Sequence, residues 1–350
     1  MRMEQIPKTA KIMVAMSGGV DSSVTAALLR QKGLEVSGVF MLLGQAGAAE
    51  QAAKVQKIAD FLKIPFTPLD LEAEFNLQVL SYFSKSYLRG KTPNPCMVCN
   101  KTIKFGKLLD YALGQGMDYL ATGHYAETTT GEDGITRLFC GADPKKDQAY
   151  FLSRLSQAQL AKIVFPLGGT TKKKVYETAG ELGLTGLHNS SESQDICFMD
   201  GRSLKEYFAD MPEAKSGDFI TASGESKGRH TGIWHYTVGQ RRGLGIPDTT
   251  PYYVTGLDAA TNNVIIGKDR DLWHRTLQLK TINWLSGQAP RLPAEFTVKI
   301  RYRHNGAAAC VRLRDQQLTM EFKEPQRAIT PGQFAVLYRH NEVIGSGEIC

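Results

Sequence analysis

The sequence predicts an α/β fold: an N-terminal doubly wound parallel sheet followed by two small, mainly β domains, the last of them a β-barrel. In the first part of the chain, short apolar runs alternate with segments of helical periodicity, which is typical of parallel sheets with crossover helices. A Ser-Gly-Gly turn joins the first apolar run to the first helical segment. Beyond Gly201, helical periodicity fades and short strands with Gly, Pro and Asn turns replace it. We therefore expect domains at residues 1–200, 201–275 and 276–350.

The elements of the first domain follow from the spacing of apolar residues. Strands are predicted at residues 11–16, 36–41, 65–70 and 119–123. Helices are predicted at residues 20–32, 49–62 and 75–89. Residues 141–184 are predicted to form a loop followed by helices.

The bulk composition indicates a globular protein of a reducing compartment. The 350 residues include 22% charged and 42% hydrophobic residues, and no apolar run is long enough for a membrane span. Residues 1–10 lack the apolar segment of a secretory signal, so we expect a cytoplasmic protein that does not enter a membrane. Six cysteines are too few for a disulfide scaffold. The net charge of +7 favours a polyanionic partner.

Residues 17–23, Ser-Gly-Gly-Val-Asp-Ser-Ser, form the turn before the first helix. Backbone N–H groups and the helix dipole attract anions at such a turn, and glycine lets phosphate oxygens approach closely. The alternative is a plain glycine turn in which Asp21 and Ser22 cap the helix. Ligands of such sheets bind beyond the carboxyl ends of the strands. Gly123 and His124, which end the fourth strand, would then lie beside this turn.

Residues 91–100 carry Cys96 and Cys99 behind the sequence Thr-Pro-Asn-Pro. The two prolines predict a rigid excursion that stops any helix there. A Cys-x-x-Cys spacing places two sulfurs within reach of one metal ion or of each other. No second pair lies nearby, as structural zinc would require, and Pro-Asn-Pro is unlike a thioredoxin site. The residues alone leave redox or sulfur chemistry, a metal site and coincidence open.

Two basic stretches precede the last domain. Residues 172–174 are three lysines, which we interpret as a solvated face. Residues 226–245 combine Lys, Arg and His with Trp234 and Tyr236 and contain no acidic residue. Basic groups interleaved with aromatic rings are typical of nucleic-acid surfaces.

The last domain carries a third basic stretch at residues 298–303. Strand alternation would place Lys299, Arg301 and Arg303 on one face. That face would offer three cations to a phosphate backbone.

Seven motifs occur along the chain in one order, at residues 17–22, 92–100, 122–125, 146–151, 196–198, 239–245 and 330–333. The first resembles the Ser-Gly-Gly-x-Asp-Ser loop of the ATP pyrophosphatase (PP-loop) superfamily, whose fold is adenine nucleotide alpha hydrolase-like. The whole set resembles the tRNA-specific 2-thiouridylase (MnmA) family and covers nearly the whole chain. The resemblance implies an enzyme that places sulfur on C2 of the wobble uridine in certain tRNAs.

The resemblance also implies site residues. Those for ATP are Ala15, Met16, Ser17, Gly18, Gly19, Val20, Asp21, Ser22, Met41 and Gly123. Those for the target base are Asn94, Pro95 and Cys96. Those for tRNA are His124, Lys146, Asp147, Gln148, Arg301, Tyr302 and Gln333. Cys99 would be the nucleophile and Cys197 the persulfide carrier.

The implied chemistry uses ATP with Mg²⁺, whose charge would offset that developing on the phosphates. Asp21 would either organise this metal ion or cap the helix. In the family, a sulfur-relay or cysteine desulfurase donor loads Cys197, and Cys99 releases the sulfur or resolves the carrier, leaving a Cys99–Cys197 disulfide. The loop at residues 189–197 would have to fold over the site, because a disulfide needs Cα atoms within about 7 Å. The alternative is a 4Fe-4S cluster on Cys96, Cys99 and Cys197.

This sequence departs from the family pattern at two places. Many members carry Asp where this chain has Cys96, so no carboxylate role is carried over. Residues 42–49 are shorter and plainer than usual, and nothing is assigned to them. Two rival functions remain: a PP-loop ligase or amidotransferase for a small molecule, and an RNA-binding protein with a regulatory ATP site.

Overall fold

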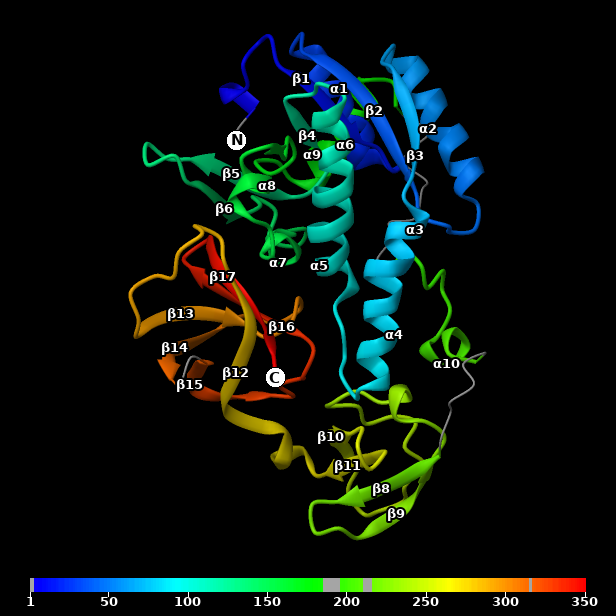
Figure 1. Ribbon diagram of the computed structural model, residues 1–350, viewed down its shortest axis with the longest axis vertical. Helices are drawn as coiled ribbons and strands as arrows, with labels where there is room; N and C mark the ends of the chain where they lie inside the picture. Colours follow the sequence, from blue (N-terminus) through cyan, green and yellow to red (C-terminus); the bar gives the residue numbers. More distant parts are fainter. Residues whose placement is uncertain (1–2, 185–195, 210–215, 315–316) are drawn as a thin grey trace.

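The computed structural model describes residues 3–184, 196–209, 216–314 and 317–350. A parallel sheet lies at one end of the molecule, and a barrel and a smaller sheet lie at the other (Figure 1). The fold class predicted from the sequence is confirmed.

The parallel sheet has the strand order β3-β2-β1-β4-β7, and every neighbouring pair in it is parallel. Its strands are β1 (Lys11–Ala15), β2 (Glu35–Leu42), β3 (Phe66–Asp70), β4 (Tyr119–Ala121) and β7 (Ile163–Val164). The helices α1 (Val20–Gln31), α2 (Ala48–Leu62) and α9 (Lys172–Glu181) pack against it. The sequence analysis did not predict β7, because a strand of two residues is too short to show a periodic pattern of apolar residues.

Two helical columns run from this sheet toward the smaller sheet (Figure 1). The first consists of α3 (Glu72–Phe75), the π-helical η2 (Asn76–Leu80) and α4 (Ser81–Leu88). The second consists of α5 (Pro95–Cys99), the π-helical η3 (Asn100–Lys107) and α6 (Leu108–Gly114). The second column contradicts the prediction that the prolines stop a helix. Pro95 is its first residue, where a helix needs no N–H group.

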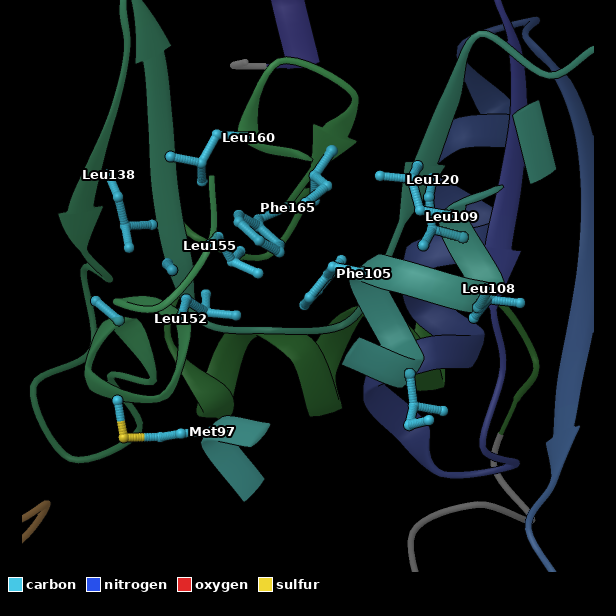
Figure 2. Close-up of a cluster of buried hydrophobic side chains, with 14 of the residues drawn as sticks. Met97, Phe105, Leu108, Leu109, Leu120, Leu138, Leu152, Leu155, Leu160 and Phe165 are labelled. Carbon is cyan, nitrogen blue, oxygen red and sulfur yellow. The ribbon is translucent and has the colours of Figure 1, made fainter. Parts of the chain in front are cut away.

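A buried cluster fixes the second column against the sheet. Phe105 of η3 and Phe165 after β7 point toward one another, and their ring centroids are 5.9 Å apart (Figure 2). The short helices α7 (Ala149–Leu152) and α8 (Gln157–Leu160) add Leu152 and Leu160 to the same cluster. The position of the cysteine-bearing helix therefore depends on a fully apolar core.

The smaller sheet has the order β10-β11-β8-β9 and packs on α4. Its strands are β8 (Gly217–Thr221), β9 (Ser226–His230), β10 (Tyr253–Asp258) and β11 (Asn263–Gly267), with the one-turn helices α10 (Leu204–Tyr207) and η5 (Ile233–His235) nearby. Trp234 and Tyr236 are buried here with Phe83 of α4. The prediction that these two rings face nucleic acid is wrong.

The last domain is a closed barrel, because β12 pairs with both β15 and β17. Its strands are β12 (Trp273–Trp284), β13 (Ala294–Lys299), β14 (Ala307–Arg314), β15 (Gln317–Arg327), β16 (Phe334–Arg339) and β17 (Glu342–Ile349), entered through η6 (Asp269–Leu272). A hairpin from the first domain, β5 (Ala126–Thr130) and β6 (Thr136–Cys140), extends the sheet through β17. The sequence analysis did not predict this hairpin.

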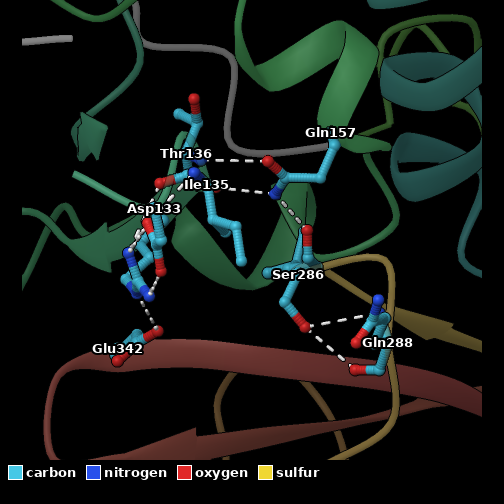
Figure 3. Close-up of polar contacts among 9 residues, drawn as sticks. Asp133, Ile135, Thr136, Gln157, Ser286, Gln288 and Glu342 are labelled. Atoms are coloured by element: carbon cyan, nitrogen blue, oxygen red, sulfur yellow. Dashed lines mark hydrogen bonds and ion pairs between the residues drawn. The ribbon is translucent and has the colours of Figure 1, made fainter. Parts of the chain in front are cut away.

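Polar contacts hold the hairpin and the barrel together. The amide of Gln157 bonds the Thr136 backbone and donates to the Leu285 carbonyl, next to Ser286 (Figure 3). Arg137 forms ion pairs with Asp133 and, at 3.7 Å, with Glu342 of β17. The barrel is therefore fixed to the first domain.

Candidate active site

The turn between β1 and α1 has the geometry of an anion-binding loop. Gly18 adopts a left-handed φ of +78°. The Ser22 hydroxyl accepts the Ser17 N–H at 3.1 Å and donates to the Gly19 carbonyl at 3.1 Å, which closes the turn. Gly19 is the N-cap of α1 and provides no side-chain acceptor. Among the described residues, no N-cap side chain therefore occupies the first-turn N–H groups of α1, as an anion site requires.

The carboxyl ends of neighbouring strands meet at this turn. Ala15 ends β1, Met16 follows it and is buried, and half-buried Met41 lies near the end of β2. Gly123 follows β4, where an added Cβ would lie 3.0 Å from the Asp21 backbone carbon. A Cβ here would crowd the backbone at the start of α1. The structure thus brings together the strand ends and the turn that carry the predicted ATP residues.

Asp21 is held by a lysine rather than used as a cap. The ammonium of Lys172, at the start of α9, lies 2.8 Å from both carboxylate oxygens of Asp21. The Tyr125 hydroxyl donates to the same carboxylate at 2.7 Å. The interpretation of residues 172–174 as a solvated face is therefore wrong for Lys172, whereas Lys173 is 89% exposed.

Cys96 and Cys99 lie on the first turn of α5. The side-chain oxygen of Asn94 caps this helix by accepting the Met97 N–H at 3.3 Å. Residues three apart on a helix share one face, so both thiols face the same way. The pair thus occupies a helix N-terminus, contrary to what the sequence suggested.

Cys197 approaches this pair from the segment that joins the first two domains. Burial, with a smaller contribution from the charge of Cys197, raises the pKa of Cys96 to about 11 and that of Cys99 to about 12. Cys197 is partly exposed, yet the protein around it still raises its pKa. The structure therefore brings the three predicted cysteines within electrostatic range. The predicted covering loop is residues 189–197, of which residues 189–195 lie outside the described residues.

Phe198 fixes the position of Cys197. Its ring makes edge contacts with Phe75 at 5.9 Å and Phe83 at 5.0 Å, and it lies 5.8 Å from Tyr207. These partners belong to the first helical column and to α10. The segment that bears Cys197 is therefore anchored on the column beside the one that bears Cys96 and Cys99.

The ammonium of Lys104 is the cation that the three thiols share. Its charge lowers the pKa of Cys96, Cys99 and Cys197 against the effect of burial. Lys104 lies on η3, five residues beyond Cys99. The sequence analysis did not identify it, because residues five apart do not share a face of an ordinary α-helix.

The six cysteines all carry free thiols in this structure, so the expected Cys99–Cys197 disulfide is not present. Within the described residues, no group of three or more His, Cys, Asp or Glu side chains is arranged to hold a metal ion. The three thiols therefore do not fit a preformed iron–sulfur site as they stand.

His124, a predicted tRNA residue near β4, is held in place by contacts within the protein. The ring of His124 packs near Phe105 and Phe165 and bonds the Thr122 hydroxyl at 2.7 Å. Burial, with a contribution from the Lys104 charge, holds the pKa of His124 well below its usual value, so the ring is neutral. Its neutral form suits a contact with a base better than one with a phosphate.

The predicted residues 146–148 form the tight turn before α7. Buried Asp147 accepts the N–H groups of Gly141 at 2.9 Å and Ala149 at 3.1 Å. Gln148 accepts the Tyr125 N–H at 3.1 Å. These side chains hold the turn beside the anion loop, and Lys146 is half-buried there.

The barrel brings Arg301, Tyr302 and Gln333 toward the same region. The Tyr302 hydroxyl donates to the Asp147 carbonyl at 3.2 Å, and Arg301 donates to the Arg327 carbonyl at 3.2 Å. β13 ends at Lys299, so the predicted strand alternation through residue 303 is wrong. The side-chain amide of Gln333 donates to the carbonyls of Thr92 and Pro93, just before α5.

The fold and this loop define a class: a HUP-type nucleotide-binding domain followed by two β-barrel domains. Family models match it as a tRNA methyl transferase HUP domain at residues 10–201, a tRNA methyl transferase PRC-barrel domain at residues 205–268 and an aminomethyltransferase β-barrel domain at residues 274–349. Each model covers one of the three sheets described above.

Curated relatives define the family. A tRNA-specific 2-thiouridylase MnmA of Desulfotalea psychrophila is 46% identical over 339 residues, covering 96% of this chain and 98% of that one. One from Enterococcus faecalis is 42% identical over 357 residues, covering 97% and 95%. The chain belongs to the tRNA-specific 2-thiouridylase (MnmA) family, as its motifs indicated.

Likeness to solved structures is weak by comparison. A 4-thiouridine synthetase in complex with RNA and ATP gives a TM-score of 0.35 at 18% identity, covering 51% of this chain and 42% of that one. In the described part of the chain, no helix is both long and apolar enough to cross a membrane.

Proposed function

We propose that this protein is an ATP-dependent tRNA sulfurtransferase that converts C2 of the wobble uridine to a thiocarbonyl. The observation that carries the proposal is that two features adjoin one buried core, against which Ala15, Met41 and Cys99 all pack. These are an anion loop suited to a triphosphate and three thiols placed on and beside a helix N-terminus. Full-length membership in the 2-thiouridylase family supports the same reading.

In the proposed reaction, the C2 oxygen of uridine attacks the α-phosphorus of ATP and pyrophosphate leaves. The loop at residues 17–22 would hold the leaving pyrophosphate through the N–H groups of α1 and through its hydroxyls. Mg²⁺ bound to ATP would offset charge on the phosphates. The adenylated C2 then has AMP as a leaving group, which the carbonyl lacked.

Sulfur would arrive as a persulfide on Cys197, delivered by a sulfur-relay or cysteine desulfurase donor. The terminal sulfur attacks C2 and AMP departs. Cys99 then attacks the sulfur of Cys197, which forms a Cys99–Cys197 disulfide and leaves the second sulfur on C2 as the thiocarbonyl. A dithiol reductant must restore both thiols before the next turnover. The cytoplasm would supply one, and we propose that location.

We propose that the tRNA lies across all three domains, with residues 1–200 performing the chemistry and residues 201–275 and 276–350 shaping the surface. The target base would enter near Asn94, Pro95 and Cys96. The contacts to tRNA would come from His124, residues 146–148, Arg301, Tyr302 and Gln333.

The test is thiolation of unmodified tRNA by protein purified without oxygen, with iron and acid-labile sulfide counted on the same sample. We expect 2-thiouridine only with ATP and a sulfur donor, no bound iron, and loss of product in Cys99→Ser and Cys197→Ser but not in Cys96→Ala. About four irons per chain, lost together with activity in Cys96→Ala, would replace the persulfide route by a cluster route. ATP–pyrophosphate exchange with a small acid, and no use of tRNA, would replace the function itself.

A further inference from the structure

A pocket of about 230 Å³ opens in the middle domain, in the loop between η5 and β10. It is lined by residues 241–246, Pro251 and Tyr252. Residues 241–245 belong to the motif at residues 239–245, to which the reaction proposed above gives no role. The pocket therefore needs an explanation of its own.

The charge of this pocket is positive. Arg241 and Arg242 are exposed, and neither forms an ion pair with any residue that the structure describes. The acidic residue closest to them in the sequence is Asp248, which pairs with Lys268 at 2.7 Å. The ammonium of Lys268 lies 3.6 Å from the centre of the Tyr252 ring in the pocket wall. Because the one nearby carboxylate already has its own cation, the charge of both arginines is available to an anion.

The backbone of the loop adds hydrogen-bond donors to the pocket. Gly243 and Gly245 have left-handed φ values of +79° and +69°. Leu244 between them is buried in the core of the middle domain, which holds the turn in place. Within the described residues, the N–H groups of the two glycines donate to no protein acceptor. Turns of this kind form anion-binding concavities, and a guanidinium binds phosphate oxygens through two parallel hydrogen bonds.

The loop starts beside the segment that leads into the cysteine helix. The Thr237 hydroxyl bonds that of Thr92 at 3.2 Å, two residues before Asn94. Arg241 follows Thr237 by four residues, which span at most about 14 Å. An RNA strand whose base enters near Asn94 would therefore pass within reach of the pocket.

We propose that residues 241–246 form a binding site for a backbone phosphate in the anticodon arm of tRNA, held by Arg241, Arg242 and the N–H groups of the loop. This inference rests on the proposed function in taking tRNA as the partner. It assigns to the middle domain a contact that positions the anticodon arm while the wobble uridine lies at the cysteine helix.

The test measures the affinity for an isolated, unmodified anticodon arm at several salt concentrations by equilibrium titration, so it does not depend on sulfur transfer. We expect Arg241→Gln with Arg242→Gln to raise the Kd about tenfold. The slope of log Kd against log salt should fall by about 1, as for the loss of one phosphate contact. Arg241→Lys with Arg242→Lys should keep the slope, because the charge remains, and should raise the Kd less.

Arg270→Gln is the matched control, since Arg270 is 87% exposed on η6 and pairs with Asp271 at 3.7 Å. It should bind the anticodon arm as the wild-type protein does, and thermal unfolding checks that every variant is folded. The Kd for MgATP should be unchanged in all variants.

Three results would overturn the proposal. In the first, the double glutamine variant has the Kd and the salt slope of the control. In the second, it loses affinity for MgATP but not for the anticodon arm, which would assign the pocket to the nucleotide. In the third, it loses affinity only for full-length tRNA, which would place the phosphate outside the anticodon arm. If the wild-type protein binds neither RNA, the proposed function fails together with this inference.

Discussion

Two thiols of this site, those of Cys96 and Cys99, are half-buried, and a nearby cation favours their ionised, nucleophilic form. A thiolate, not a thiol, attacks sulfur or carbon, and burial opposes its formation. Cys99 has a pKa of about 12 even with the Lys104 ammonium nearby, so only a small fraction ionises at neutral pH. We conclude that the reactivity of these thiols depends strongly on nearby charges. The structure identifies the ammonium of Lys104 as one of them.

Replacing Lys104 by Met should make Cys99 less reactive. Because the ammonium lowers the pKa of Cys99, its removal raises that pKa, and the thiolate fraction at a given pH falls. We expect alkylation of Cys99 at pH 8–9 to slow about fivefold, and its pH profile to move to higher pH. Mass spectrometry of iodoacetamide-treated protein measures this rate.

Lys107→Met is the control, since Lys107 is exposed on the same π-helical segment. Alkylation of Cys99 that is as fast in Lys104→Met as in the control would show that Lys104 does not act on the thiol.

Elements with strong periodicity could be predicted from the sequence, and those fixed by tertiary contacts could not. The strands β1 to β4 and the loop at residues 17–22 follow from apolar runs and glycine spacing. The sequence predicts that Pro95 stops a helix, because proline disrupts a helix interior. At the first position of a helix, however, proline is favoured, since no N–H group is needed there. The basic and aromatic composition of this stretch predicts a surface for Trp234 and Tyr236, and it cannot show that the turn at η5 directs both rings into the core.

The residues of the candidate site also fall into two groups: those that the sequence located and those that only the tertiary contacts reveal. Its loop and its cysteines lie in motifs, so the sequence located them. Lys172 lies in a run of three lysines, and only the packing of α9 distinguishes it from its neighbours. Phe198 was part of a motif, but its contacts with the first helical column cannot be read from spacing.

Truncating Phe198 should release the segment that bears Cys197. Its ring contacts Phe75, Phe83 and Tyr207, so Phe198→Ala should reduce the free energy of unfolding by about 2 kcal/mol. Because Cys197 would be less well positioned, we expect the rate of single-turnover sulfur transfer to fall about tenfold. The affinities for ATP and tRNA should be unchanged.

Phe61→Ala provides the control, since Phe61 is 56% exposed on α2. Wild-type transfer kinetics in Phe198→Ala would mean that Cys197 is positioned by something other than this ring.

The three domains meet at the segment that leads into the cysteine helix. Thr92 receives a hydrogen bond at its carbonyl from Gln333, at 3.0 Å, and its N–H donates to the Pro331 carbonyl at 3.0 Å. The Thr92 hydroxyl bonds that of Thr237 in the middle domain at 3.2 Å. Gly332, with a φ of +89°, lies so close to Thr92 that a Cβ would come within 3.0 Å of its carbonyl oxygen. The barrel is thus in a position to set where α5 begins.

Gln333 therefore has a structural role that can be separated from its predicted contact with tRNA. Its amide donates to the carbonyls of Thr92 and Pro93, and Gln333→Ala would leave both without this donor. Losing these bonds should cost about 1–3 kcal/mol of stability. With the start of α5 less constrained, alkylation of Cys99 should become faster in the protein without tRNA.

Chemical denaturation and mass spectrometry measure the two effects, and Gln317→Ala, at an exposed site in β15, is the control. If Gln333→Ala instead weakens tRNA binding and leaves stability and Cys99 reactivity unchanged, its amide serves tRNA and the barrel does not control the cysteine helix.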